Sequence, residues 1–278
     1  MKLAFEQWGE GREPLLLLHG FTGNRTAWDH LRPLFSPRFD ALAVDLPGHG
    51  ESSPCERAGP AGFEQTLSAL EGILDSLGAR GVNLVGYSQG ARLALALAFR
   101  APGRIGRVVL ESGSPGLRSE RERAARRRSD EALACQIESV GTESFIERWG
   151  RRPLFQGLRR LPSELACALR ARRLSCSAAG LASALRSLGA GAQPSYWEQL
   201  PRLRVPVLLL SGARDSKFSG IARQMARELP LAWAKSFQGA WHAPHLEAPA
   251  EYAQEVIGFL GATWFEPPSA DQKVEAVT

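Results

Sequence analysis

The chain has 278 residues, of which 44% are hydrophobic and 23% are charged, and its formal net charge is +5. These values are typical of a folded globular protein and exclude an intrinsically disordered chain. The longest unbroken apolar run, 93–99, has seven residues, whereas a membrane-spanning helix needs about 20. The N-terminal residues turn polar too early to form the apolar core of a secretory signal, so we expect a cytoplasmic location.

The four cysteines are widely spaced and include no Cys-x-x-Cys pair. Isolated thiols in a chain of this length are typical of small hydrophobic residues in a reducing compartment. We therefore expect no disulfide framework among Cys55, Cys135, Cys167 and Cys176.

Apolar runs that are typical of buried strands alternate with helical patterns along the chain. Near-continuous apolar runs are expected for parallel strands that are covered on both faces, and their alternation with helices indicates an α/β sheet. The expected strands cover residues 15–20, 40–48, 82–88, 107–113, 205–212 and 232–239.

The alternation stops between residues 114 and 200, where the sequence is rich in Arg, Ala and Leu and contains no strand candidate. Its helical periodicity indicates a helical insertion. From Arg118 to Arg173 the insertion holds 14 Arg, no Lys and eight acidic residues, a net charge of +6, so the positive excess of the chain is local. The expected parts are a first core part (1–113), a helical cap (114–200), a second core part (201–265) and a flexible polar tail (266–278).

The segment NLVGYSQGARLAL, residues 83–95, places a Gly-x-Ser-x-Gly motif between an expected strand and an expected helix. The small residues Gly86 and Gly90 permit a sharp turn that exposes the Ser88 hydroxyl at the carboxyl end of the sheet, near a helix N-terminus. The five-residue pattern alone is common, but the strand–turn–helix context indicates a nucleophile. Ser88 is therefore the candidate reactive residue.

A serine hydroxyl needs a base to take its proton and an acid to orient that base. His242 follows the last expected strand, where the chain order Ser, Asp, His places the base. Asp215 lies three residues beyond the preceding strand, in the position of the acid. The sequence therefore predicts a triad of Ser88, Asp215 and His242, whereas His19 and His49 lie in turns and are expected to have structural roles.

The backbone N–H groups of Gln89, which follows the serine, and of Phe21, in the loop after the first core strand, are the expected oxyanion hole. A metal site is not expected, because His242, His245 and Glu247 form a single cluster without the further converging ligands that zinc requires. The sequence indicates no cofactor.

The motifs LLLLHGFTG, DLPGHGES, LVGYSQGARLAL, SGARDSKF and HAPHLE resemble, in this order, the α/β-hydrolase superfamily with a helical cap, over nearly all of residues 1–265. The cap segments at 122–130, 145–155 and 173–200 are further similar to the 2-succinyl-6-hydroxy-2,4-cyclohexadiene-1-carboxylate synthases of the menaquinone pathway. The resemblance implies a mostly parallel sheet with helices on both faces. It also implies a lyase that eliminates pyruvate from a cyclohexene carrying succinyl, carboxylate and enolpyruvyl groups.

Five positions match the substrate-binding residues of this family, and the resemblance implies the same role for them here. They are the arginines Arg92, Arg126 and Arg173 and the aromatic residues Tyr87 and Trp149. An arginine four residues after the serine lies one helical turn away on the same face, and its planar guanidinium group can bind a carboxylate at two points. The structural alternatives are a snorkelling Arg92, solvated Arg126 and Arg173, and a Trp149 that only fills the core.

Two residues need separate mention. Trp241 stands directly before His242, where the family usually has glycine, so we expect the indole to shift the histidine or to narrow the pocket. Lys217 belongs to the family's Asp-x-Lys-Phe pattern, but the sequence assigns it no role.

Other functions share parts of these patterns. A carboxylesterase or a hydrolase of carbon–carbon bonds would use the same triad through an acyl-Ser88 intermediate. A non-catalytic binding protein could keep the fold, and nucleic-acid binding would use the basic insertion, which has none of the recognised motifs. We expect a small anionic polycarboxylate as the partner, neither nucleic acid nor a membrane, and a monomer or small homo-oligomer.

Overall fold

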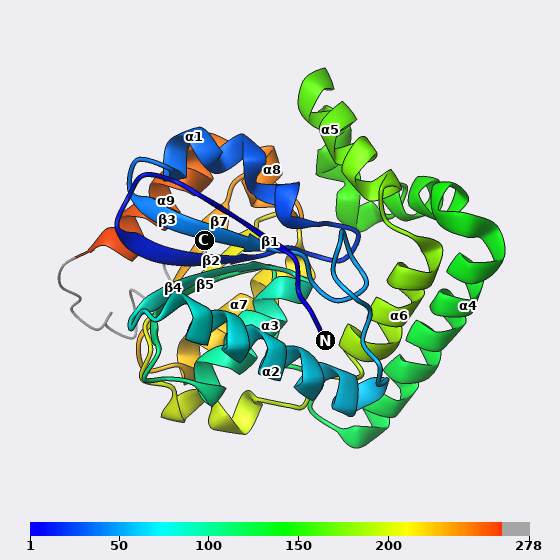
Figure 1. Cartoon of the computed structure of the whole chain (residues 1–278), viewed down its shortest axis with the longest axis horizontal. Coiled ribbons are helices and arrows are strands. Elements are labelled where there is room, and N and C mark those ends of the chain that lie inside the picture. Colours follow the sequence, from blue (N-terminus) through cyan, green and yellow to red (C-terminus); the bar gives the residue numbers. More distant parts are fainter. Residues whose placement is uncertain (263–278) are drawn as a thin grey trace.

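The computed structural model describes residues 1–262 as one sheet with helices on both faces and a helical insertion (Figure 1). This architecture confirms the expected α/β fold class. The expected tail, 266–278, and the last residues of the second core part, 263–265, lie outside the described residues. None of the described helices combines the length and the apolar character that a membrane span requires.

Seven strands of the described chain form the sheet, in the order β1-β3-β2-β4-β5-β6-β7. They are β1 (Phe5–Trp8), β2 (Glu13–Leu18), β3 (Phe39–Val44), β4 (Val82–Tyr87), β5 (Ile105–Glu111), β6 (Val207–Gly212) and β7 (Ala232–Phe237). All neighbours pair in parallel except β1, which is antiparallel to β3 at the edge. The sequence did not predict β1, because this strand has only four residues and alternates between exposed and more buried side chains.

The helices fall into two groups. Those of the core are η1 (Arg25–Leu31), α1 (Arg32–Phe35), α2 (Gly59–Leu77), α3 (Gln89–Arg100), α7 (Ser216–Glu228), α8 (Pro244–Glu247) and α9 (Pro249–Gly261). Those of the insertion are α4 (Glu120–Gly150), η2 (Pro153–Arg160), α5 (Ser163–Leu174), α6 (Ala178–Leu188) and η3 (Trp197–Arg202). In Figure 1, α2 and α3 lie on one side of the sheet and α1 and α9 on the other.

The leucines of β2 show why the sheet is covered on both faces. Leu16 and Leu18 pack in a core with α2, α3 and α7, whereas Leu15 and Leu17 pack on the opposite face with η1, α1 and α9. All four side chains are fully buried. Because successive side chains of a strand point to opposite faces, such a run needs an apolar layer on each side.

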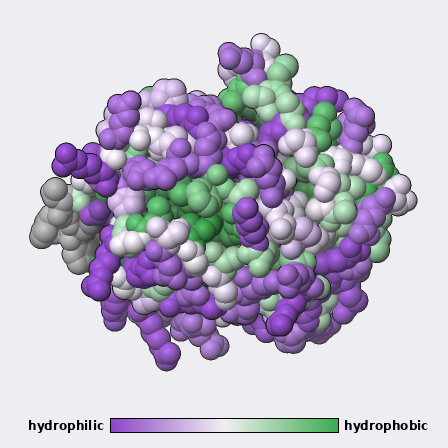
Figure 2. Space-filling view, in the orientation of Figure 1, coloured by the Kyte–Doolittle hydropathy of each residue, from purple (hydrophilic) through white to green (hydrophobic). Residues whose placement is uncertain are grey.

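Apolar surface remains near the sheet edge. Figure 2 shows apolar residues gathered over the β1 side of this face, with hydrophilic residues covering most of the rest. Among the described residues, Phe5 of β1 is 49% exposed and Leu34 of α1 is 45% exposed. Single exposed apolar side chains such as that of Leu34 are normal in globular proteins.

The insertion contains helices and no strand between residues 114 and 200. Its first helix, α4, begins with a capping box in which the Ser119 hydroxyl accepts from Glu122 N and the Glu122 carboxylate accepts from Ser119 N. The helix bends at Gly141, where φ is +75°. Apolar residues of α4 and α6 form a small core of their own. The division of the chain into core and cap stays a prediction.

The backbones of the insertion and the core are in close contact at two glycines, Gly48 and Gly180. A Cβ atom on Gly180, in the first turn of α6, would lie 2.2 Å from the carbonyl oxygen of Gly48. A Cβ atom on Gly48, which has φ +77°, would lie 2.3 Å from the Gly180 carbonyl oxygen. Only glycine at both positions allows α6 to lie this close to the loop after β3.

We expect Gly180→Ala to lower the free energy of unfolding by about 1–3 kcal/mol, because the new methyl group forces α6 away from the core. Gly72→Ala in α2 is the matched control, since a Cβ atom there meets nothing within 4 Å. That change should instead stabilise the protein by about 0.5–1 kcal/mol. Urea unfolding measures both, and equal stabilities for the two variants would contradict the close contact.

Candidate active site

Ser88 lies in a strained turn between β4 and α3, with φ +52°. Two glycines make the turn possible. A Cβ atom on Gly90 would lie 2.0 Å from the Leu18 carbonyl oxygen, and one on Gly86 would lie 2.6 Å from the Gly90 backbone. The turn is anchored by the Ser88 N–H, which donates to the carbonyl oxygen of Glu111 over 2.8 Å. The side chain therefore stands at the carboxyl end of the sheet.

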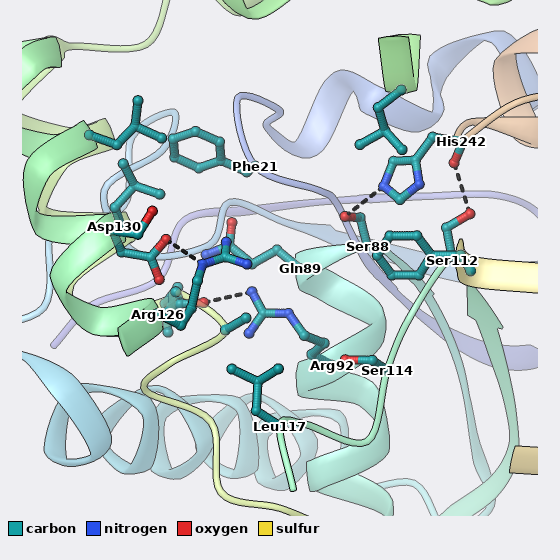
Figure 3. A pocket seen from close by; sticks show the side chains of 18 of the residues that line it. Phe21, Ser88, Gln89, Arg92, Ser112, Ser114, Leu117, Arg126, Asp130 and His242 are labelled. Atoms are coloured by element: carbon teal, nitrogen blue, oxygen red, sulfur yellow. Dashed lines mark hydrogen bonds and ion pairs between the residues drawn. The ribbon is translucent and has the colours of Figure 1, made fainter. Parts of the chain in front are cut away.

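The structure brings together the three residues of the expected triad, of which Figure 3 shows Ser88 and His242. Ser88 Oγ lies 3.1 Å from His242 Nε2, and His242 Nδ1 lies 2.7 Å from Asp215 Oδ2. The other oxygen of Asp215 accepts from Phe218 N at the start of α7. The Ser112 hydroxyl donates to the carbonyl oxygen of His242 over 2.9 Å. Both the carboxylate and the imidazole are thus fixed by neighbouring elements, and the catalytic roles stay a prediction.

A second histidine–carboxylate pair lies buried beside the triad. Glu111 Oε1 accepts from His245 N over 3.1 Å and lies 2.8 Å from His245 Nδ1. Burial raises the pKa of Glu111 to about 8 and lowers the pKa of His245 well below its ordinary value. The pair is therefore uncharged near neutral pH. The signal in the sequence was an acidic residue inside the apolar strand RVVLES, which the search for a triad passed over.

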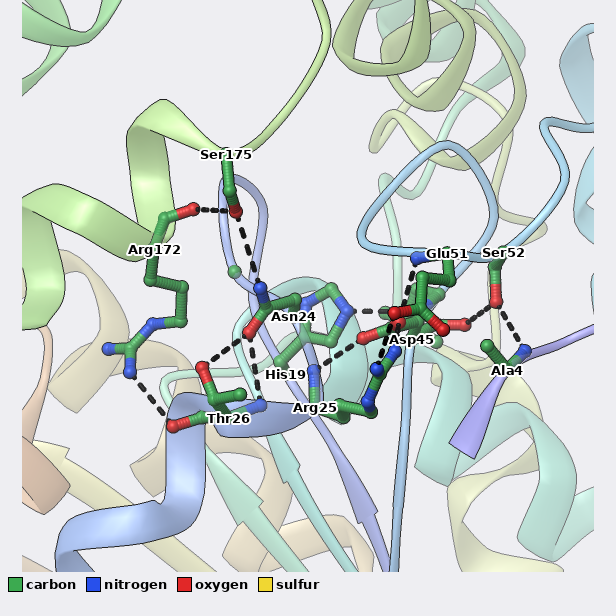
Figure 4. A network of polar contacts seen from close by, with 12 residues as sticks. Ala4, His19, Asn24, Arg25, Thr26, Asp45, Glu51, Ser52, Arg172 and Ser175 are labelled. Carbon is green, nitrogen blue, oxygen red and sulfur yellow. Dashed lines mark hydrogen bonds and ion pairs between the residues drawn. The ribbon is translucent and has the colours of Figure 1, made fainter. Parts of the chain in front are cut away.

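Loops under the cap are joined by buried polar residues (Figure 4). Asp45 accepts from Arg25 Nη1 and from the backbone N–H groups of Arg25 and Glu51. His19 Nε2 accepts from Leu46 N over 2.9 Å, and His49 Nε2 accepts from the backbone of the loop after β2. His19 and His49 therefore hold these two loops together, which is the structural role expected for them.

Ser88 and His242 open on a cavity of about 610 Å³ between the sheet and the insertion. Six of the expected site residues outside the triad lie in its wall, namely Phe21, Tyr87, Gln89, Arg92, Arg126 and Trp149. Phe21 and Gln89 line the same cavity as Ser88, and their role as an oxyanion hole stays a prediction.

Arg92 turns its guanidinium group into the cavity. Its Nη2 donates to the Leu188 carbonyl oxygen over 2.7 Å, and its Nη1 lies 3.4 Å from Gln193 Oε1. Burial lowers the pKa of Arg92 to about 10, so the group stays charged at neutral pH. The guanidinium group is thus held by the end of α6, and its role in substrate binding stays a prediction.

Arg126 is partly neutralised, since its Nε donates to Asp130 Oδ1 over 2.7 Å. The wall also contains Arg152 and Lys217. The Cζ atom of Arg152 lies 4.2 Å from the ring centroid of Trp149. Both residues belong to the segment 145–155, from which the sequence predicted only Trp149 as a site residue. The described wall thus holds four cationic side chains and a single carboxylate, that of Asp130. Within residues 1–262, Arg92, Arg152 and Lys217 have no carboxylate within 4.0 Å.

Arg173 lies outside this cavity. It lines a second cavity of about 30 Å³, and its Cζ lies 5.2 Å from the ring centroid of Phe155, which belongs to the walls of both cavities. The structure therefore separates Arg173 from Arg92 and Arg126 by an aromatic ring. The sequence could not place it, because the separation depends on how the insertion folds.

The expectation for Trp241 was wrong. The residue is absent from the described cavity wall, and His242 keeps its hydrogen bonds to Ser88 and Asp215. The backbone N–H groups of Trp241 and Ala243 donate to the Glu247 carboxylate over 2.9 and 3.1 Å. Trp241 thus contributes a backbone N–H to this turn and does not line the described cavity.

Comparisons with known proteins agree with the geometry. The family described as "Alpha/beta hydrolase family" matches residues 15–255. A Bacillus subtilis strain 168 protein, provisionally named a 2-succinyl-6-hydroxy-2,4-cyclohexadiene-1-carboxylate synthase, is 36% identical over 89% of this chain and 90% of its own length. The synthase of that name from Citrobacter koseri is 34% identical over 88% and 93%. The solved structure of MenH from S. aureus superposes with a TM-score of 0.86 at 34% identity, covering 93% of this chain and 97% of the other.

We expect Glu111→Gln to flatten the pH dependence of stability. The pKa of Glu111 is raised from 4.5 to about 8 in the folded protein, so its contribution is fully present below about pH 4.5 and is lost as the pH rises through about 8. Glutamine does not titrate. Urea unfolding at about pH 5, 7 and 9 compares the two chains, with Glu64→Gln on the surface of α2 as the control. Parallel curves for wild type and Glu111→Gln would contradict the raised pKa.

Proposed function

The chain belongs to the alpha/beta hydrolase family and, within it, to the 2-succinyl-6-hydroxy-2,4-cyclohexadiene-1-carboxylate synthases, and we propose that it eliminates pyruvate in menaquinone biosynthesis. The substrate is 2-succinyl-5-enolpyruvyl-6-hydroxy-3-cyclohexene-1-carboxylate, and the ring product is 2-succinyl-6-hydroxy-2,4-cyclohexadiene-1-carboxylate. The protein is then a carbon–oxygen lyase on a hydrolase scaffold.

The observation that carries this proposal is the charge of the cavity into which Ser88 opens. Arg92 lies one helical turn from the serine without a carboxylate partner, and Arg152 and Lys217 are likewise unpaired within the described chain. The substrate carries three carboxylates, on the ring, the succinyl arm and the enolpyruvyl arm. Guanidinium groups form strong charge-assisted bonds with carboxylates, so this wall suits a polyanion and gives a neutral ester no advantage.

The names of substrate and product define the bond changes. A proton leaves C2, which the succinyl carbonyl group makes acidic. The ring double bond moves from C3–C4 to C2–C3, a second forms between C4 and C5, and the enolpyruvyl oxygen leaves C5 with the electron pair. Protonation of the released enolpyruvate gives pyruvate. No water is consumed, so the serine need only transfer a proton.

The chain offers groups for each step. Asp215 accepts from His242 Nδ1–H, which leaves Nε2 free to draw the proton of Ser88 Oγ at 3.1 Å. Ser88 then takes the C2 proton as a general base. The N–H groups of Phe21 and Gln89 stabilise the negative charge that develops on the succinyl carbonyl oxygen.

A direct test couples the purified protein to the upstream enzyme that makes the substrate and follows pyruvate with lactate dehydrogenase. We expect one pyruvate for each ring product. The esterase alternative keeps one specific observation in its favour, since the same Ser88 and His242 geometry suits an attacking nucleophile. Mass spectrometry of the quenched enzyme separates the two, because an acyl group on Ser88 during turnover would support the esterase.

For Ser88→Ala we expect kcat to fall roughly 10²–10⁴-fold, because the positioned base is lost. The small side chain keeps the strained turn, so the circular dichroism spectrum and urea midpoint should stay close to those of the wild type. Full pyruvate release by this variant would remove Ser88 from the mechanism.

For Arg92→Gln we expect kcat/KM to fall roughly 10–150-fold, which corresponds to about 1.5–3 kcal/mol for one charge-assisted contact. Arg100→Gln is the matched control, since Arg100 lies on the same helix but pairs with Glu64 and Glu71 at the surface. The control should react at the wild-type rate. Equal values for the two variants would return Arg92 to a structural role.

We also propose a cytoplasmic location. The four cysteines are free thiols in the structure, which suits a reducing compartment.

A further inference from the structure

The second cavity lies between the insertion and the core and has a volume of about 30 Å³. Phe155 lies in its wall and in the wall of the cavity around Ser88. The core side of the second cavity is formed by residues 20–23 together with Tyr87 and His245, and its other side by Arg172 and Arg173 of α5. A space of this size holds about one water molecule or one halide ion. It is too small for phosphate, sulfate or a polycarboxylate.

Two adjacent arginines meet at this cavity without a counterion. Arg172 is 9% exposed, and its Nη1 donates to the Thr26 carbonyl oxygen over 2.9 Å (Figure 4). Within the described residues, neither Arg172 nor Arg173 has a carboxylate within 4.0 Å. Asp29 influences the pKa of Arg172, but it pairs at 3.8 Å with Arg32.

The walls supply no negative charge. Burial raises the pKa of Tyr87, which lines the cavity, well above its ordinary value, so the phenol stays protonated. Burial also raises the pKa of Cys176, which belongs to the insertion but lies outside the wall, to about 12. Burial lowers the pKa of His245, which stays neutral. Burial and, to a smaller extent, the neighbouring Arg173 lower the pKa of Arg172 to about 10, and the group keeps its charge at neutral pH. Arg172 is buried and Arg173 is partly buried, and two like charges held close together with little access to water are unfavourable unless an opposite charge joins them.

We propose that the second cavity binds one small monovalent anion, such as chloride, between Arg172 and Arg173, and that the bound anion fastens the insertion to the core. A carboxylate arm of the substrate reaching past Phe155 has the same chemistry, but the volume of about 30 Å³ favours a free halide. The proposed anion site is distinct from the wall around Ser88 in Arg172 and Arg173, whereas Phe21, Tyr87 and Phe155 belong to the walls of both cavities.

The test measures the melting temperature of the full chain in sodium gluconate while bromide replaces gluconate at constant ionic strength. We expect a saturable rise of about 2–4 °C at a tenfold excess over the dissociation constant. Arg172→Met should lose the saturable rise. Arg170→Met is the matched control, because Arg170 lies on the same helix, is exposed and pairs with Glu143, and it should keep the rise. Equal melting temperatures in gluconate and bromide would overturn the proposal.

A second measurement does not depend on how well Arg172→Met folds. Crystals of the wild-type chain soaked in bromide should give an anomalous peak between Arg172 and Arg173. A peak elsewhere, or none, would overturn the proposal. The same soak with succinate or pyruvate present distinguishes the sources. An unchanged peak supports a separate halide site, whereas loss of the peak would assign the cavity to a carboxylate arm.

Discussion

Ser88 holds a backbone conformation that L-residues rarely adopt, and a single hydrogen bond from its N–H to the Glu111 carbonyl oxygen ties that conformation to the neighbouring strand. The same end of β5 supports the histidine, since Ser112 donates to the His242 carbonyl oxygen and the Glu111 side chain holds His245. Serine and histidine come from segments 154 residues apart. Their separation of 3.1 Å is therefore supported from the carboxyl end of β5, where the Glu111 carbonyl oxygen accepts from the Ser88 N–H and Ser112, directly after the strand, donates to the His242 carbonyl oxygen.

The arginines of the insertion differ in whether a carboxylate pairs with them. On the outside, Arg123 and Arg127 pair with Glu120, and Arg186 pairs with Glu131 and Glu138. Such exposed pairs contribute little to stability. The cationic groups that face the cavity near Ser88 have only Asp130 among them. Seven exposed arginines of the same insertion have no carboxylate within 4.0 Å among the described residues, namely Arg118, Arg121, Arg128, Arg148, Arg151, Arg159 and Arg160. The local net charge of +6 is therefore spread over the outer surface as well as the cavity wall.

The sequence predicted features that depend on local pattern and chain order. The leucines of β2 form an apolar run that only a doubly covered strand explains, and the glycines around Ser88 are required by contacts under 3 Å. The features it did not predict depend on tertiary placement. The sequence does not show that Glu111 contacts His245. It also does not show that Phe155 lies beside Arg173, which therefore lines the second cavity and not the one around Ser88. Strand β1 has only four residues with one exposed side, and this is too short an alternation of exposed and buried side chains to predict a strand.

The bend in α4 has a consequence for the range of molecules that this architecture accepts. Gly141 divides the helix into a first half that carries Arg126 and a second half that carries Trp149, and a side chain added at the bend would meet nothing within 4 Å. The distance between the Arg126 guanidinium group and the Trp149 indole therefore depends on the backbone conformation of Gly141, which lies in the insertion and not in the sheet. A change of this conformation would lengthen or shorten the gap between charge and aromatic ring without changing the turn that holds Ser88.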